Sequence, residues 1–167
     1  GTVVLNVTSG DFVDVGEGTV LNLEGLIAEN VHTYRSSFVF NYGGIVNIEN
    51  CTFRDSSINS VEGLLYSYGG VLNINNSAFV NLTAISETSS AYGGAIYGGS
   101  YAEVNVANSR FLDNYCGDFG GAICIYTAGN LKVINSTFIN NSARFRGGAI
   151  YNGMESKTVV MNSTFLN

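Results

Sequence analysis

The sequence is poor in charge, and poorest in basic residues. Only 12% of its 167 residues are charged, and seven Lys and Arg against thirteen Asp and Glu give a net charge of -6. Domains that bind nucleic acid carry a basic stripe that neutralises phosphates. We therefore expect no nucleic-acid partner.

Long apolar runs and helix-forming runs are also missing. No segment approaches the roughly 18 apolar residues that a spanning helix needs, so we expect no membrane span in this segment. Proline and tryptophan are absent, whereas glycine is frequent and ten Phe and ten Tyr are present. This composition favours strands. Because Gly1 lies inside an apolar run and Asn167 inside a motif, we expect a mature chain or a piece of a longer one.

Residues that bind metals are scarce. Cys51, Cys116 and Cys124 are irregularly spaced and His32 is the only histidine, so no zinc pattern is present. We expect His32 on the surface. Acidic residues that could bind calcium lack the spacing of a calcium loop. We expect them in solvated turns instead: Asp11, Asp14, Glu17 and Asp118. We expect no metal or other cofactor.

One sequence repeat recurs along most of the chain. Phenylalanine recurs every 26 to 32 residues, at Phe53, Phe79, Phe111, Phe138 and Phe165. Three positions before each stands an asparagine, and we call these five the bend asparagines: Asn50, Asn76, Asn108, Asn135 and Asn162. Two positions after each stands Asp or Asn: Asp55, Asn81, Asp113, Asn140 and Asn167. Such a period, built of short strands and turns, is typical of a solenoid.

The repeats predict a single domain with a right-handed parallel β-helix fold of about five to six coils. Each repeat offers three short strand-like runs and no helical run, and equivalent positions would stack about 4.8 Å apart. The repeats cover 36–61, 62–92, 93–119, 120–146 and 147–167, and 1–35 are a degenerate first coil or a cap. Stacking predicts an internal phenylalanine column and a buried ladder of the bend asparagines. Paired glycines such as Gly93-Gly94 would supply positive φ or close backbone approach.

The motifs resemble those of known surface proteins. Gly-Gly-Ala-Ile-Tyr followed by Asn-Ser-Thr-Phe is similar to the repeats of chlamydial polymorphic outer-membrane proteins and of adhesin-like surface proteins of methanogenic archaea. The resemblance covers roughly residues 36–167. It implies an extracellular β-helix of pectate-lyase-like shape, used in adhesion or as envelope material, without catalytic residues.

A polysaccharide lyase or hydrolase is the enzymatic alternative. It would need carboxylates paired across a groove, or a metal with a basic residue. Asp55 and Asp113 are the candidates, but other coils hold Asn at their position, which favours a structural role. The remaining basic residues occupy scattered repeat positions and are expected in solvent: Arg110, Lys132, Arg144 and Arg146. We expect no catalysis.

Aromatic residues share two further repeat positions. One position holds Phe40, Tyr66, Tyr97 and Tyr151, and the other holds Tyr42 and Tyr68. If Val39, Leu65 and Ile96 point inward, alternation turns the first row outward, where it could stack on sugars or pack against another subunit. The alternative, that the glycine bend shifts the phase and the row is core, stays open.

Seven asparagines start an Asn-x-Ser/Thr sequence, the acceptor pattern for N-glycosylation. Because bend asparagines are expected to be buried, the acceptor sequences that start at 50, 135 and 162 are interpreted as by-products of the repeat. The remaining ones are the expected sites: Asn6, Asn75, Asn81 and Asn140.

The cysteines are expected to be unpaired. Cys51 takes the small inward position that Ser77 and Ser109 hold in other coils, so a buried thiol is predicted. Cys116 and Cys124 could form a bridge in an extracellular protein. Alternatively, an exposed Cys116 could link subunits. The sequence slightly favours no intramolecular bridge.

These patterns predict a non-catalytic structural or adhesive β-helix, extracellular or on the cell surface. The first alternative is a self-assembling subunit of an extracellular filament or sheath, since open β-helix ends expose strand edges. The second is a β-helix that binds or degrades polysaccharide. The expected partners are other copies or flanking coils at the open ends, and host or envelope glycans.

Overall fold

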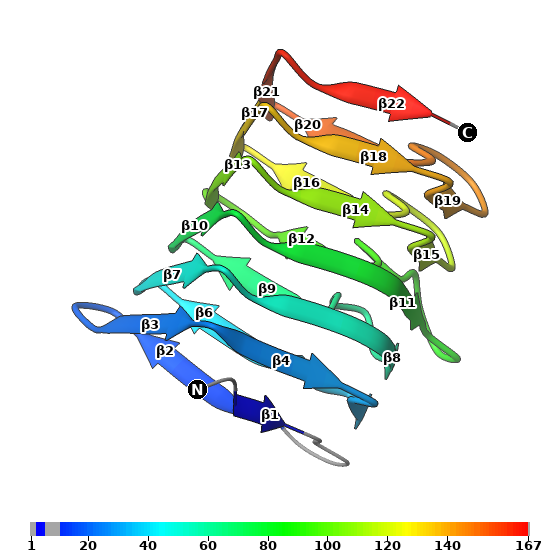
Figure 1. Cartoon of the computed structure of the whole chain (residues 1–167). Coiled ribbons are helices and arrows are strands. Elements are labelled where there is room, and N and C mark those ends of the chain that lie inside the picture. Colours follow the sequence, from blue (N-terminus) through cyan, green and yellow to red (C-terminus); the bar gives the residue numbers. More distant parts are fainter. Residues whose placement is uncertain (1–2, 6–10, 167) are drawn as a thin grey trace.

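The computed structural model describes residues 3–5 and 11–166, which form a parallel β-helix (Figure 1). Short strands follow one another around three sheets, and the coils stack from the blue N-terminal end to the red C-terminal end. The described residues contain no helix, and so none that could cross a membrane. The predicted fold of three strands per coil is therefore confirmed.

The first sheet contains one strand from every coil. Its six parallel strands are, in stacking order, β2 (Val13–Gly16), β6 (Val39–Tyr42), β9 (Leu65–Tyr68), β12 (Ile96–Gly98), β16 (Ile123–Thr127) and β20 (Ile150–Met154). The second sheet follows it around each coil. It comprises β3 (Val20–Glu24), β7 (Ile45–Glu49), β10 (Val71–Asn75), β13 (Glu103–Ala107), β17 (Asn130–Ile134) and β21 (Lys157–Met161).

The third sheet is the longest. Its main path is β1 (Val3–Leu5), β4 (Leu26–Glu29), β8 (Thr52–Asn59), β11 (Ala78–Ile85), β14 (Arg110–Leu112), β18 (Thr137–Ile139) and β22 (Thr164–Leu166). Three short strands extend it sideways, namely β5 (His32–Tyr34), β15 (Tyr115–Cys116) and β19 (Ser142–Ala143). Residues 13–34 pair with the next coil through β2, β3, β4 and β5, so this degenerate segment forms a coil of its own.

The phenylalanine column runs through the middle of the core. The register aligns Phe79 with Phe111 and Phe111 with Phe138. Their rings stack with centroids 4.7 Å apart and planes within 3°. All three side chains are buried, so the column expected from the repeat is present.

The glycine pairs make the turn into the first sheet. Gly120 has φ of +72°, a region that costs glycine little. At Gly121, a Cβ would lie 1.9 Å from the carbonyl oxygen of Gly148 in the next coil, so any side chain would push the coils apart. Both expected reasons for the pair therefore hold.

The bend asparagines turn the chain from the second sheet into the third, and their expected burial is wrong. All five are exposed, and all five have left-handed backbone, with φ between 47° for Asn76 and 54° for Asn50. Their amides form only a partial surface ladder: Asn108 Nδ2 donates to Asn75 Oδ1 at 2.8 Å, and Asn135 Nδ2 to Asn108 Oδ1 at 3.4 Å. The left-handed turn points these side chains outward, whereas continued strand alternation would have turned them in.

Asn108→Gly is expected to leave stability nearly unchanged, whereas Asn108→Ala should cost about 1 kcal/mol. The reason is the backbone, since asparagine and glycine visit left-handed φ more easily than alanine does. Gly25 already occupies this position in the first coil, with φ of +64°. Urea unfolding of the two variants checks this. Equal losses in both would instead indicate that the amide contacts matter.

Buried serine hydroxyls link adjacent coils in the interior. The sequence predicted only that their position is small and points inward. Ser77, Ser109 and Ser136 are buried, and each Oγ donates to the carbonyl two residues before it, at 2.7–2.8 Å. Each also accepts the backbone N–H of the equivalent residue in the preceding coil, as Ser109 Oγ does from Ser77 N at 3.1 Å. This serine ladder satisfies backbone groups that would otherwise be stranded in the core.

A second internal ladder uses asparagines outside the bend row. Asn114 and Asn141 are buried, and Asn114 Nδ2 donates to Asn141 Oδ1 at 2.9 Å and to the carbonyl of Phe79 at 3.0 Å. Asn114 Oδ1 accepts the N–H of Leu82 at 3.1 Å. The buried amide ladder therefore exists, but three residues after the phenylalanines instead of three before them.

Candidate functional site

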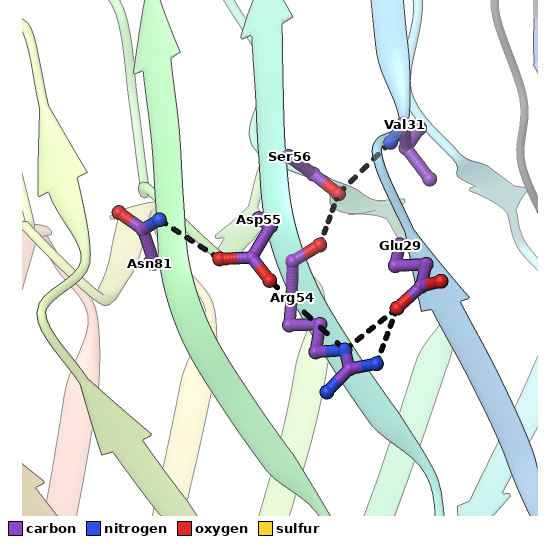
Figure 2. Close-up of polar contacts among 6 residues, drawn as sticks. All are labelled: Glu29, Val31, Arg54, Asp55, Ser56 and Asn81. Atoms are coloured by element: carbon purple, nitrogen blue, oxygen red, sulfur yellow. Dashed lines mark hydrogen bonds and ion pairs between the residues drawn. The ribbon is translucent and has the colours of Figure 1, made fainter.

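The two candidate catalytic carboxylates lie at the outer corners that follow β14 and interrupt β8. Asp55 and Asp113 have left-handed φ of 51° and 54° and are exposed. Asn81 Nδ2 donates to Asp55 Oδ1 at 2.9 Å, and Asn140 Nδ2 donates to Asp113 Oδ1 at 3.1 Å (Figure 2 shows the first pair). Each carboxylate thus accepts an amide from the next coil, as expected for a structural ladder.

The groups around Asp55 also tie neighbouring coils together (Figure 2). The Arg54 guanidinium donates to Glu29 Oε2 from Nε at 2.8 Å and from Nη2, and Nε lies 4.0 Å from Asp55 Oδ2. Ser56 Oγ donates to the carbonyl of Arg54 and accepts the N–H of Val31 at 3.0 Å. The ion pair is exposed, so it adds little stability. The cluster joins three coils and pairs its carboxylates with amide or guanidinium groups.

The aromatic row lies on the outer face of the first sheet. Val39, Leu65 and Ile96 point into the core and are fully buried, while Phe40, Tyr66, Tyr97 and Tyr151 on the other side are half-buried. The outward alternative is therefore the correct one. Cys124 interrupts this aromatic row. There the row continues through Tyr92 and Phe119, whose rings stack with centroids 5.5 Å apart.

Ring stacking limits what this row can bind. Tyr97 lies between Tyr66 and Tyr92, with both centroid distances at 5.0 Å and both interplanar angles at 20°. Because the rings of Tyr66, Tyr97 and Tyr92 cover one another's faces, this middle part of the row offers solvent mainly ring edges and hydroxyls. A sugar cannot stack on faces that are already covered.

A second aromatic pair leaves one face open. Tyr42 and Tyr68 stack with centroids 5.6 Å apart and planes within 3°. On its other side Tyr42 is paired with Gly16, which has no side chain to cover the ring. Tyr42 is 60% exposed, so it is the aromatic platform of this face.

Stability is expected to fall as the pH rises above about 10, where unfolded tyrosine ionises. Burial raises the pKa of Tyr66 to about 12 and also raises the pKa of Tyr97. Between the unfolded and folded pKa values the unfolded chain binds fewer protons, so rising pH favours unfolding. Tyr97→Phe should flatten the fall in a series of urea titrations. A profile identical to that of the parent would contradict this cause.

All three cysteines are buried and free. Cys51 occupies the serine-ladder position as predicted, and its Sγ contacts the carbonyls of Leu23 and Glu49 at 3.4 and 3.3 Å. Cys116 and Cys124 are not bridged in the structure. The alternative of an exposed Cys116 is wrong, because this residue lies in β15 and faces the interior. Burial raises the pKa of both thiols, which makes them poor nucleophiles.

Two of the four acidic residues considered for calcium accept backbone N–H groups instead. Asp11 Oδ1 accepts the N–H of Ser37 at 2.8 Å, and Asp118 Oδ2 accepts the N–H of Ala91 at 2.7 Å. Within the described residues, no three His, Cys, Asp or Glu side chains gather as a metal site would need. His32 is exposed as predicted, with Nδ1 3.1 Å from Ser57 Oγ.

The basic residues face solvent, and Lys132 and Arg110 each line a groove. Arg110, Lys132, Arg144 and Arg146 are all exposed, as expected. On the outer face of the second sheet, an amide ladder unnoticed in the sequence ends beside Lys132. It links Asn22, Asn47, Asn73 and Asn105, with Nδ2–Oδ1 distances of 2.8–3.1 Å. Beside it runs a groove of ≈390 Å³. Asparagines spaced by one repeat could have revealed this ladder.

The glycosylation candidates fall into distinct surroundings. Asn6 lies outside the described residues. Asn75 is half-buried, whereas Asn81 and Asn140 are exposed and hold Asp55 and Asp113. The bend asparagines at 50, 135 and 162, dismissed as buried, are exposed as well.

Comparison with known proteins places the chain in one family. Residues 15–167 match the model of the right-handed β-helix region, so the chain belongs to this family and its coils wind right-handed. No curated protein and no solved structure matches the chain significantly.

Proposed function

We propose that this chain belongs to an extracellular or cell-surface protein with a structural or adhesive role and without catalytic activity. The observation that carries the proposal is the use of its polar side chains. The carboxylates of Asp55 and Asp113, the serine hydroxyls and the internal amides all bond to a neighbouring coil. Such side chains stiffen a rod instead of converging on a substrate.

The adhesive part of the proposal rests on Tyr42. Its open ring face beside Gly16 is a platform on which the apolar face of a sugar ring could pack. The resemblance to adhesin-like and polymorphic outer-membrane repeats supports the same role. Host or envelope glycans are the expected ligands.

A glycan array probed with the folded chain tests the adhesive role. We expect binding to at least one glycan, and a loss of about tenfold in affinity for Tyr42→Ala, which removes the stacking face. Tyr34→Ala is the matched control, because this tyrosine is 58% exposed but lies on β5 of the third sheet. Equal losses in both variants would contradict a site at Tyr42.

Two further measurements distinguish the proposed role from the two alternatives, an enzyme and a self-assembling subunit. Cleavage of polygalacturonate or a related glycan, lost in Asp55→Asn or Asp113→Asn, would establish an enzyme. Electron microscopy of native material separates an adhesin from a sheath. The last coil leaves Val159, Phe165 and Leu166 exposed beside the open edges of β21 and β22. Flanking coils or other copies are the proposed partners there, and end-to-end filaments would favour self-assembly.

A further inference from the structure

The corner between the second and third sheets carries three exposed Asn-x-Thr sequences. We propose that Asn50, Asn135 and Asn162 accept N-linked sugars and that Asn75, which starts an Asn-x-Ser sequence, does not. The proposal rests on the proposed surface function, because N-glycosylation is a modification of secreted and surface proteins. It reverses the preference that the sequence alone indicated.

The backbone turns both required side chains outward. Asn50 and Asn135 have left-handed φ of 54° and 49° and are exposed. The middle residues, Cys51 and Ser136, point into the core. Strand alternation then brings Thr52 and Thr137, the first residues of β8 and β18, back to the outside. The amide and the hydroxyl of each sequence therefore lie on the same surface.

The amides of these residues are accessible. Among the described residues, no hydrogen bond is formed by the side chain of Asn50 or Asn162. Asn135 Nδ2 has only the long 3.4 Å contact with Asn108 Oδ1. An open polar groove of ≈390 Å³ runs along this corner, and Asn50, Thr52, Asn135 and Thr137 all line it. The groove leaves room for the first sugar ring.

The sequence that starts at Asn75 has the opposite geometry. Asn75 Nδ2 donates to Glu49 Oε2 at 2.9 Å, and its Oδ1 accepts from Asn108 Nδ2 at 2.8 Å. Its hydroxyl residue, Ser77, is buried in the serine ladder and bonds to the Asn75 carbonyl at 2.7 Å. To react, Asn75 Nδ2 would have to leave its contact with Glu49, and the hydroxyl is turned away from it.

Asn81 and Asn140 are intermediate cases. Both are exposed, and Ser142 lies on the surface near Asn140. However, each amide already donates to a carboxylate of the preceding coil. We therefore expect slower modification than at the three corner asparagines.

The transfer needs a sugar activated as a phosphate ester and an external transferase. The Asn Nδ2 attacks the anomeric carbon of that sugar and forms an N–C bond. The bond from this carbon to the phosphate oxygen breaks, the phosphate leaves, and one amide proton passes to a base of the transferase. No oxidation or reduction occurs.

Folded chain made without glycosylation can be incubated with a soluble N-glycosyltransferase and a nucleotide-activated hexose. Peptide mass spectrometry then gives the rate at each site. We expect the corner asparagines to react at least about tenfold faster than Asn75. The reason is that the Asn75 side chain must first break its hydrogen bonds. Peptides cut from the same chain are the unfolded control and should reduce the difference to the transferase's own preference between Thr and Ser.

Two matched variants sharpen the test. Thr137→Ala keeps Asn135 in its left-handed turn but removes the hydroxyl, so modification there should be lost. Arg110→Thr gives Asn108 the hydroxyl residue that it lacks, but Asn108 Nδ2 donates to Asn75 Oδ1 at 2.8 Å, so the added site should react as slowly as Asn81 and Asn140. Circular dichroism confirms that both variants fold.

Equal rates at Asn75 and Asn50 in the folded chain would overturn the proposal. Corner asparagines that remain unmodified in the folded chain, whether or not the peptides react, would overturn it as well. In protein from its natural source, sugar at the corner positions supports the proposal, and sugar at Asn75 alone contradicts it. These readouts are independent of glycan binding and filament formation, so the proposed function can fail separately.

Discussion

Phe111→Ala is expected to lower the free energy of unfolding by about 3–5 kcal/mol, as large-to-small aromatic changes in cores do. Phe111 is fully buried and stacks on Phe79 and Phe138, with both centroid distances at 4.7 Å. The variant leaves a cavity in mid-column that the stiff neighbouring coils cannot close. Urea unfolding followed by circular dichroism measures the loss.

Phe165→Ala is the matched control at the end of the column. Its ring stacks only on Phe138, at 4.7 Å, and is 44% exposed. Because the Phe165 ring buries less apolar surface, the free energy of unfolding should fall by only about 1–2 kcal/mol. Equal losses at Phe111 and Phe165 would contradict a core organised as stacked coils.

Asn114→Ala is expected to cost about 2–4 kcal/mol. The change removes the acceptor of the Leu82 N–H and the donor to the Phe79 carbonyl, both inside the protein. Each buried polar group left without a partner costs about 1–3 kcal/mol. Denaturant titration gives the loss, and a changed m-value would indicate that the coil opens locally.

Asn130→Ala provides the comparison for Asn114. Asn130 is exposed on β17, so its loss should lie within about 0.5 kcal/mol of zero. If Asn114→Ala were equally neutral, water would have to replace the amide inside the coil. The internal ladder would then not be a source of stability.

Much of the fold could be predicted from the sequence because stacking repeats itself. A residue that recurs once per coil must lie on its own copies, so the spacing of Phe53, Phe79 and Phe111 predicted the column and its burial. The same reasoning placed Cys51 with the ladder serines and assigned structural partners to Asp55 and Asp113. The outward row that contains Tyr66 followed from strand alternation.

The tertiary structure alone decided which asparagines are buried and which aromatic faces are free. The bend asparagines repeat perfectly, yet a left-handed turn, which alternation does not describe, points Asn108 outward. The buried Asn114 and Asn141 leave no repeated signal, because the same position holds Ser56 and Leu82 in other coils. Likewise, Tyr42 is open only because its neighbour is Gly16. The exposure of such a ring face depends on the side chain one coil away, and a local pattern does not contain that information.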